Sequence, residues 1–344
     1  MGHGKIYRGE QWQAISTPDV YFTQQYYQMS ALLESDVAET VLLEWNDDAG
    51  SIRMPLIVRN IPGTDFFDAT SAYGYGGPWS EGSPNLIEFR QFFDEWAHAN
   101  QVVSSFLRFH PLLDNALAFS DIFRVKKMGQ TAAWDLSRSQ DLVSTMASNH
   151  RRNWRKAERA GVEPRITLHP AETASFEYVY EVAMDRLSAD SFYHFSTDYW
   201  AAMRTDMRHM TLQADAVYEG RVIASVWCLL GRDYLHFHLN GTTDEARELR
   251  GAFVAHMAAA QWGRDNGYAT AHLGGGYGGA TSALLDWKHR YDPETPLRDF
   301  YIATVVHDTE IFEQLASRAA ETSFFPPWRA QTVERAERAS DLSA

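Results

Sequence analysis

The sequence predicts an α/β (α+β) protein of two similar domains, each with a mixed, mainly antiparallel sheet flanked by helices. Three observations support this class. The chain has 344 residues, whereas a single hydrophobic core stops growing at roughly 250–300 residues. Hydrophobic residues make up 45% of the chain, which suits ordinary cores and argues against disorder. Helix-like and strand-like segments alternate, and both halves have the order helix, hairpin, strand, helix, strand.

Hydrophobic spacing and turn residues predict the elements of the first half. Residues 46–50 (Asn-Asp-Asp-Ala-Gly) join two β-rich runs and are typical of a hairpin. Leu86, Phe89, Phe93 and Trp96 recur at helical spacing. The predicted elements are a helix over residues 19–33, strands over 40–45 and 52–58, a loop over 71–79, a helix from about 84 to 96, and strands over 102–109 and 131–136.

Glycines mark several boundaries in the second half. Gly161 ends a polar, basic helix, Gly267 ends a long helix, and Glu219-Gly220 joins two strands. The predicted elements are helices over residues 140–160, 173–187, 197–207 and 246–266, strands over 211–218, 221–230, 234–239, 270–273 and 297–306, and a glycine loop over 274–279. The strand over 297–306 and the tail over 324–329 are both able to fold back on the first domain. We therefore assign residues 1–138 and 308–330 to the first domain, 139–307 to the second, and 331–344 to a flexible tail.

Composition limits the class of partner. The net charge is 31 − 45 = −14, which excludes a general nucleic-acid-coating protein but leaves room for a local basic site. The single cysteine, Cys228, excludes an internal disulfide and a cysteine-based zinc site. No apolar run approaches the roughly 20 residues of a membrane span. These features predict a soluble, cytoplasmic protein. The aromatic content of 11 Trp, 16 Tyr and 19 Phe suits core packing or the lining of a long groove.

The order of elements in the second half is that of the GNAT (Gcn5-related N-acyltransferase) fold, and four segments extend the likeness. The chain resembles the Fem-type aminoacyl- and peptidyltransferases, which are tandem GNAT enzymes, over roughly residues 65–300. No heptad run corresponds to the coiled-coil arm of some members. The four segments are Tyr73-Gly-Tyr-Gly-Gly-Pro78, Leu107-Arg-Phe-His-Pro111, the basic stretch from Asn149 to Val162, and Leu273-Gly-Gly-Gly276 with Ala283 to Tyr291.

The resemblance implies an amide-forming acyltransferase and assigns one catalytic pair. Lys288 matches the lysine with which the family stabilises the transferring carbonyl, and a cation at an oxyanion in a low-dielectric site acts as an oxyanion hole. The adjacent Trp287 would stack on the substrate. The alternative is a surface lysine on a short helix.

His110 and Arg108 lie at the end of a predicted strand, where α/β folds place site residues. His110 would accept the amine proton or bind an acceptor carboxylate, and Arg108 would orient an anionic group. The alternatives are a hydrogen-bonded structural histidine and an internal salt bridge. His236 and His238 alternate along a strand and share one side; they are expected to line the substrate groove rather than to bind metal.

The two glycine loops would let the backbone approach a substrate closely. Neither fits a dinucleotide fingerprint or a P-loop. The alternative is ordinary turn chemistry with aromatic plugs. The loop residues expected to contact substrate are Tyr73, Tyr75, Gly76 and Gly77 in the first loop and Gly275 and Tyr277 in the second.

A basic helix stands out against the acidic background. Residues 151–165 carry six basic and two acidic side chains, a local charge of 6 − 2 = +4. We expect Arg151, Arg152, Arg155 and Lys156 to bind phosphates of a donor; the alternative is a solvated helix face. The sequence Arg247-Glu-Leu-Arg-Gly-Ala lacks the correctly placed glycine of a CoA pyrophosphate loop. This favours aminoacyl-tRNA over acyl-CoA as co-substrate, with no bound cofactor and with a small amine or peptide as acceptor.

Overall fold

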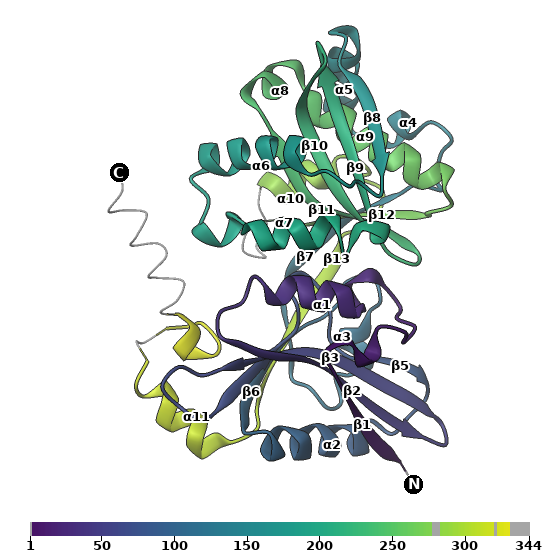
Figure 1. The fold of residues 1–344 in the computed structure, drawn as a ribbon. Coiled ribbons are helices and arrows are strands. Elements are labelled where there is room, and N and C mark those ends of the chain that lie inside the picture. Colours follow the sequence, from purple (N-terminus) through teal and green to yellow (C-terminus); the bar gives the residue numbers. More distant parts are fainter. Residues whose placement is uncertain (1, 277–282, 320–321, 331–344) are drawn as a thin grey trace. The chain divides into compact units, whose positions relative to one another are not determined.

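The computed structural model describes residues 2–276, 283–319 and 322–330, and the chain divides into two compact units. The first unit comprises Met1–Met128, Asp190–Phe192 and Phe300–Ala344, and the second comprises Gly129–Ala189 and Tyr193–Asp299. Both units combine one sheet with covering helices (Figure 1). In the described parts no helix is both long and apolar enough to cross a membrane. The mixed, mainly antiparallel architecture predicted from the sequence is confirmed.

The first unit has the strand order β1-β2-β3-β4-β6-β13, and β5 also pairs with β3. All of these pairs are antiparallel except β4 with β6. Its strands are β1 (His3–Arg8), β2 (Val37–Asp47), β3 (Gly50–Asn60), β4 (Phe67–Thr70), β5 (Trp79–Gly82), β6 (Val102–Arg108) and β13 (Arg298–Val306). Its helices are α1 (Gln24–Ala31), α2 (Leu86–Ala99), α3 (Asn115–Ala118) and α11 (Thr309–Ala316), with short 3-10 turns η1 (Gly9–Trp12), η2 (Val20–Phe22) and η6 (Pro327–Arg329).

Helix α2 shows how local sequence fixes the first unit. The side chain of Asn85 caps the helix by accepting hydrogen bonds from the backbone N–H groups of Ile87 and Glu88. Phe89 and Phe93 then fall on one face of the helix and are fully buried. They pack in a cluster with apolar residues of β2 and β3. The predicted α2 helix is therefore confirmed. The predicted hairpin is confirmed by the antiparallel pairing of β2 with β3, and the predicted glycine loop by the segment between β4 and β5.

The second unit has the strand order β7-β12-β11-β10-β9-β8, antiparallel except for β11 with β12. Its strands are β7 (Val125–Asp135), β8 (Glu163–Leu168), β9 (Thr211–Tyr218), β10 (Arg221–Leu230), β11 (Tyr234–Thr242) and β12 (Thr270–Gly275). Its helices are α4 (Leu142–Thr145), α5 (Ser148–Arg159), α6 (Ala174–Leu187), α7 (Thr197–Arg204), α8 (Asp244–Leu249), α9 (Gly251–Asp265) and α10 (Ala283–His289), with the 3-10 turn η4 (Arg208–Met210). The 3-10 turn η3 (Ser191–Tyr193) contains residues of both units.

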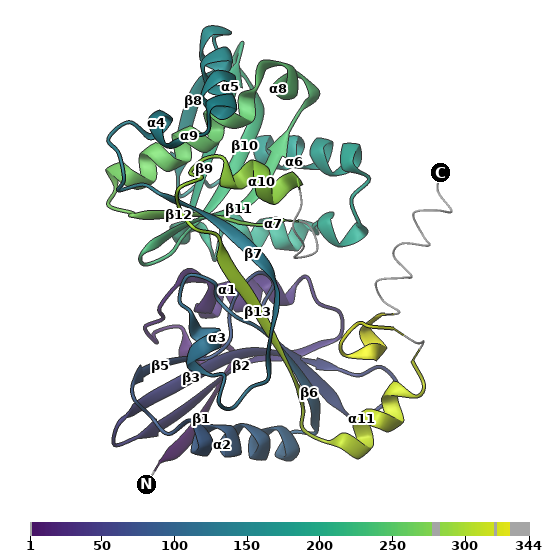
Figure 2. The ribbon, with the colours of Figure 1, turned by 180° about the vertical axis from the view of Figure 1, so that it is seen from behind.

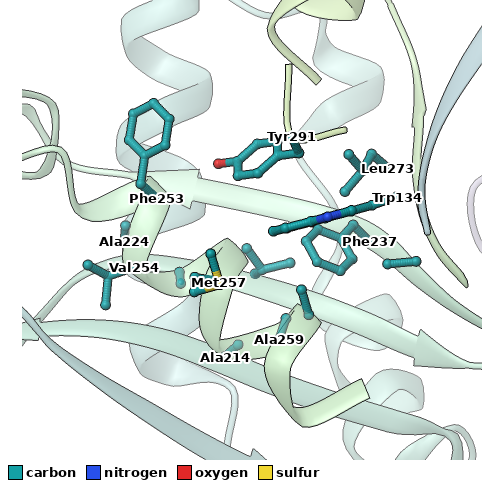
Figure 3. Packing of buried hydrophobic residues seen from close by; sticks show 14 of the residues in the cluster. Trp134, Ala214, Ala224, Phe237, Phe253, Val254, Met257, Ala259, Leu273 and Tyr291 are labelled. Atoms are coloured by element: carbon teal, nitrogen blue, oxygen red, sulfur yellow. The ribbon is translucent and has the colours of Figure 1, made fainter. Parts of the chain in front are cut away.

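Helix α9 builds the core of the second unit. It packs against β8, β9 and β10, and α5 packs on α9 (Figure 2). Figure 3 shows its Phe253, Val254 and Met257 among side chains from the strands, including Ala214 and Ala224. Small alanines on the strands let the helix approach the sheet closely.

The structure divides the chain differently from our sequence assignment. Strand β7, predicted in the first domain, belongs mainly to the second unit, and strand β13, predicted in the second domain, belongs mainly to the first. Residues Thr131–Asp135 of β7 pair with β12 in the second unit, and Ile302–Val306 of β13 pair with β6 in the first. The boundaries therefore fall near residues 128 and 299 rather than at 138 and 307. The predicted flexible tail, residues 331–344, lies outside the described residues.

Two predicted helices are each split in two. The helix over residues 140–160 becomes α4 and α5, because Met146 and Ala147 adopt extended ψ values of 152° and 151°. The helix over 246–266 becomes α8 and α9, separated by Arg250 with a left-handed φ of +66°. Gly161 has a φ of +80°, as its predicted place after a helix requires.

Candidate active site

Lys288 lies on α10 and reaches the end of β12. Its Nζ donates a hydrogen bond to the carbonyl oxygen of Gly275 at 2.7 Å. The side chain is half-buried, and the loss of surrounding water lowers the pKa of its ammonium group to about 8. Lys288 therefore remains mostly a cation at neutral pH. An ammonium group has three donors, so one bond to Gly275 leaves donors for a substrate oxygen.

Trp287 belongs to an aromatic cluster under α10. Its ring centroid lies 5.2 Å from that of His256, 5.3 Å from that of Tyr291 and 5.8 Å from that of Phe253. The indole is half-buried and packs against the core of the second unit. These contacts favour a supporting role for Trp287, which holds the helix that carries Lys288.

Two buried histidines complete this cluster. His150 of α5 donates through Nε2 to the carbonyl oxygen of Trp287 at 2.9 Å, and His256 donates through Nδ1 to the carbonyl oxygen of Ala252 at 2.8 Å. Burial lowers the pKa of His150 to about 4 and that of His256 to about 3. Both imidazoles are thus neutral at pH 7 and add no positive charge beside Lys288.

His236 and His238 lie on β11, and the neighbouring Leu235 and Phe237 belong to the hydrophobic core of the second unit. Nδ1 of His236 lies 3.2 Å from Nδ1 of His272, its partner across the parallel pair of β11 and β12. Nε2 of His238 lies 3.1 Å from the hydroxyl of Tyr199. Burial and neighbouring His236 lower the pKa of His238 to about 3. The contacts with His272 and Tyr199 connect α7, β11 and β12.

The basic helix α5 presents cations of two kinds. Arg151 turns back on the chain and donates to the carbonyl oxygen of Met146 at 2.5 Å, so it closes the end of α4. Arg152, Arg155 and Lys156 are exposed, and among the described residues none of them pairs with a carboxylate. Lys156 donates to the carbonyl oxygen of Glu248 at 3.2 Å. This face of α5 therefore carries positive charge that no carboxylate of the described residues neutralises.

In the second glycine loop, Gly275 is the last residue of β12 and supplies the carbonyl that Lys288 contacts. Tyr277 lies outside the described residues.

The first glycine loop is anchored in the first unit by side chains that the sequence analysis missed. The side-chain amide of Asn115 donates to the carbonyl oxygens of Gly76 and Pro78 at 2.8 and 2.9 Å. The hydroxyl of Tyr26 donates to the carbonyl oxygen of Tyr73 at 2.6 Å. Gly77 has a φ of +81°, a conformation that strongly favours glycine. The backbone conformation of this loop is thus enough to explain the glycine at position 77.

His110 is embedded in the first unit. Its Nδ1 accepts a hydrogen bond from the backbone N–H of Leu112 at 3.2 Å, which puts the proton of the neutral ring on Nε2. Nε2 lies 3.6 Å from a carboxylate oxygen of Asp19. The rings of Tyr21 and Tyr75 lie within 5.9 Å of the imidazole. A ring with this tautomer has no lone pair ready for an amine proton, so the geometry favours the structural alternative over the predicted base.

Arg108 is half-buried at the end of β6. Its Nη1 donates to the hydroxyl of Thr70 at 3.1 Å and to the carbonyl oxygen of Ser71 at 3.0 Å. The alternative for Arg108, an internal salt bridge, is not observed. Among the described residues, Arg108 has no carboxylate within 4 Å. The guanidinium therefore holds the start of the first glycine loop through neutral acceptors, Thr70 and Ser71.

The predicted residues fall into two groups. His110, Arg108, Tyr73, Tyr75, Gly76 and Gly77 belong to the first unit, and Lys288, Trp287, Gly275, His236, His238 and the α5 cations belong to the second. One exposed group in the second unit has the chemistry of a metal site: the ligand atoms of Glu181, Asp185 and His194 lie within 4.8 Å of one another. Sequence reasoning missed His150, although it lies inside the basic stretch, because a single histidine among arginines has no distinctive spacing.

Comparisons with known proteins agree with this architecture. Residues 144–289 match the model of the acetyltransferase (GNAT) domain family. No curated protein matches the sequence. The structure of FemX is similar, with a TM-score of 0.65 and 10% identity over 91% of this chain and 99% of that chain.

Two further solved structures share the fold. A tandem GNAT protein from the clavulanic acid biosynthesis pathway has a TM-score of 0.51 and 10% identity over 89% of this chain and 99% of that one. The C-terminal domain of a putative lysylphosphatidylglycerol synthetase from Agrobacterium fabrum has a TM-score of 0.51 and 13% identity over 77% and 83% of the two chains. At these identities the likeness concerns the fold, and the matched GNAT domain concerns the second unit. The chain therefore has a Fem-like tandem GNAT fold, and its residues 144–289 match the acetyltransferase (GNAT) domain family.

Proposed function

We propose that this acyltransferase moves an aminoacyl group from aminoacyl-tRNA to the amine of a peptide, a peptidoglycan precursor or a specialised metabolite. The amine nitrogen attacks the ester carbonyl carbon, and a C–N bond forms. The C–O bond to the terminal ribose of the tRNA then breaks. The amine loses one proton and the ribose oxygen gains one, so the products are an amide and uncharged tRNA. The ester already carries the activation, and the proposal needs no resident cofactor. This donor implies a reaction in the cytoplasm.

Lys288 is the proposed catalytic residue. When the amine attacks, negative charge develops on the carbonyl oxygen, and a partly desolvated ammonium group stabilises that charge more than the neutral ester. The bond to the carbonyl oxygen of Gly275 fixes the direction of the Nζ atom before substrate arrives. Fixed donors of this kind lower the barrier because they need little reorganisation during the reaction.

The observation that best supports aminoacyl-tRNA as the donor is the exposed basic face of α5. Arg152, Arg155 and Lys156 point positive charge at solvent in a chain of net charge −14. Phosphates are the natural counter-ions of such a cluster, and a nucleic-acid end supplies several at regular spacing. Because only the end of a tRNA needs to dock, the acidic remainder of the chain does not oppose this donor.

A second candidate donor is acyl-CoA, and one observation favours it. Arg250 adopts a left-handed φ of +66° directly before α9, and no side chain caps this helix. The backbone therefore turns as a glycine would, and the first turn of α9, in which the N–H of Phe253 already bonds to the carbonyl oxygen of Arg250, has no side-chain cap that would compete with a pyrophosphate. In this case the amine would displace the CoA thiol, and the product would again be an amide.

The experiment supplies both donors to the purified protein with a panel of amines and detects the amide by mass spectrometry, with and without RNase. The proposal expects product from charged tRNA that RNase abolishes. Product from acyl-CoA alone, unaffected by RNase, would replace the first candidate by the second.

Two variants test the residues. Lys288→Ala should lower kcat by about 10²–10³-fold, the usual effect of losing one oxyanion donor; a loss below threefold would remove Lys288 from the mechanism. The double variant Arg152→Glu, Arg155→Glu should weaken tRNA binding and flatten its dependence on salt. Arg204→Glu with Arg221→Glu is the matched control, because both arginines already lie beside carboxylates. Equal effects of the two double variants would show that α5 is only a solvated face.

A further inference from the structure

Arg108 is half-buried and, unlike the buried arginines Arg59 and Arg329 of the first unit, forms no ion pair with a carboxylate of the described residues. Arg59 pairs with Glu34 and Asp68, and Arg329 pairs with Asp68 at 2.8 Å. Arg108 contacts only neutral acceptors within the described residues, the Thr70 hydroxyl and the Ser71 carbonyl. Taking a cation partly out of water is costly unless an opposite charge compensates it. Within the described part of the chain, no carboxylate pairs with the Arg108 guanidinium.

The electrostatic surroundings support this reading. Burial lowers the pKa of Arg108, Arg59 lowers it further, and Glu34 acts in the opposite direction. Glu34 is already bound to Arg59, so its charge is shared. The guanidinium stays protonated, because the ordinary pKa of arginine lies far above neutral pH. An anion that approached Arg108 would gain a charge-assisted hydrogen bond and would offset the cost of burial.

The orientation of the guanidinium indicates which kind of anion would bind to it. Both hydrogen bonds of Arg108 use Nη1, and the group lies 4.8 Å from the ring centre of Phe106, which restricts its plane. The Nε and Nη2 donors of a fixed guanidinium match the two oxygens of a carboxylate. The backbone at Ser71 begins the glycine loop, so a group held by Arg108 lies where that loop starts.

We infer that Arg108 anchors a carboxylate subsite in the first unit, and that the acceptor is therefore an amine that also carries a carboxylate, such as an amino acid or a peptide with a free C-terminus. This inference rests on the proposed amide-forming function. It excludes simple amino sugars and alkyl amines as preferred acceptors. A carboxylate on the acceptor would orient the amine and leave Arg108 neutralised in the complex.

The test compares two probes that differ only in that carboxylate. Glycyl-alanine and glycyl-alaninamide have the same amine, and their binding to the full chain is measured by ligand-observed NMR without any donor. We expect the free acid to bind more tightly than the amide by about tenfold to a hundredfold, the value of a hydrogen bond between charged groups. Arg108→Gln should remove this preference by weakening the acid alone, and Arg108→Lys should keep part of it.

Controls separate this inference from the proposed function and from misfolding. Arg90→Gln alters a first-unit arginine that already pairs with Asp94 at 2.8 Å, and it should leave the preference intact. Thermal unfolding checks that the Arg108 variants are folded. Equal binding of acid and amide to the wild type, or an unchanged preference in Arg108→Gln, would overturn the subsite. Because no donor is present, failure of tRNA-dependent transfer would leave this result unaffected.

Discussion

The ammonium group of Lys288 and the carbonyl oxygen of Gly275 form a 2.7 Å hydrogen bond that joins α10 to the end of β12. The two residues are thirteen positions apart, and the segment between them includes the second glycine loop. The bond therefore connects Lys288, the catalytic candidate on a helix, to a residue at the end of a strand. A cation fixed in this way keeps its position when a substrate carbonyl arrives, which is the condition for oxyanion stabilisation.

The reaction should depend on the charge of Lys288. Its pKa is lowered to about 8, so the cation is present below pH 8 and is lost as the pH rises through that value. With saturating acceptor, kcat should therefore fall above about pH 8. Lys288→Arg retains a cation throughout the accessible range, and its residual activity should show no such fall. A wild-type rate that continues to rise past pH 9 would instead make Lys288 a base.

The buried histidines should make the second unit sensitive to acid. The pKa values of His150 and His256, about 4 and about 3 in the folded state, lie below the unfolded value of about 6.5. As the pH falls below 6.5 the unfolded chain binds protons first, so stability is lost from that point downward. Each histidine should cost about 2 kcal/mol at pH 5 relative to pH 8. Denaturant unfolding at several pH values measures this loss.

His256→Asn supplies the comparison for the acid effect. The asparagine amide can reproduce the bond from Nδ1 to the carbonyl oxygen of Ala252 but does not titrate. The variant should start from lower stability and lose less of it between pH 8 and pH 5. If both proteins lose stability with the same slope, His256 does not cause the acid sensitivity.

A serine, a histidine and an aspartate in the first unit have the order of a hydrolytic triad. The Ser105 hydroxyl lies 2.9 Å from Nε2 of His307, and Nδ1 of His307 lies 2.8 Å from Asp94. Ser105 is fully buried, so we expect no labelling by a fluorophosphonate and no loss of transfer activity in Ser105→Ala. The variant should lose about 1–3 kcal/mol of stability, because a buried ring nitrogen loses its partner.

The adjacent Ser104 provides a matched control for this prediction. Its hydroxyl is also buried but has no hydrogen-bond partner among the residues that the structure describes, so Ser104→Ala should be neutral or slightly stabilising in denaturant unfolding. Fluorophosphonate labelling of the folded wild type that Ser105→Ala abolishes would contradict the structural reading and indicate a second, hydrolytic activity.

The C-terminal segment is bound to the first unit through a buried carboxylate. Asp68 accepts hydrogen bonds from Trp328, Arg329 and Arg59 at 2.8, 2.8 and 2.7 Å. Asp68→Asn should lower the free energy of unfolding by about 3–5 kcal/mol, because it leaves buried guanidinium groups without compensation. Asp36→Asn removes a more exposed partner of Arg329 and should cost far less. Equal losses would mean that burial of Asp68 does not matter.

Local chemistry made much of the fold predictable. The hairpin from β2 to β3, the Glu219-Gly220 turn and Gly161 all depend on residues close in sequence, and each lies where the sequence indicated. The split of the helix over residues 140–160 was not predictable, because the hydrogen bond between the backbone N–H of Ala147 and the carbonyl oxygen of Arg290 joins residues far apart in sequence.

By itself the sequence determined the class of the protein: two units of alternating strands and helices, a basic helix in an acidic chain, and the Trp287-Lys288 pair that resembles the Fem-type enzymes. Only the tertiary structure decided which sheet β7 and β13 join, because strand pairing depends on edges that are distant in sequence. It also decided that His110 is engaged by its neighbours, whereas Arg108 has no described counter-ion. Residue type sets what a side chain is able to do, but its chemistry depends on burial and on neighbours that only the folded chain brings together.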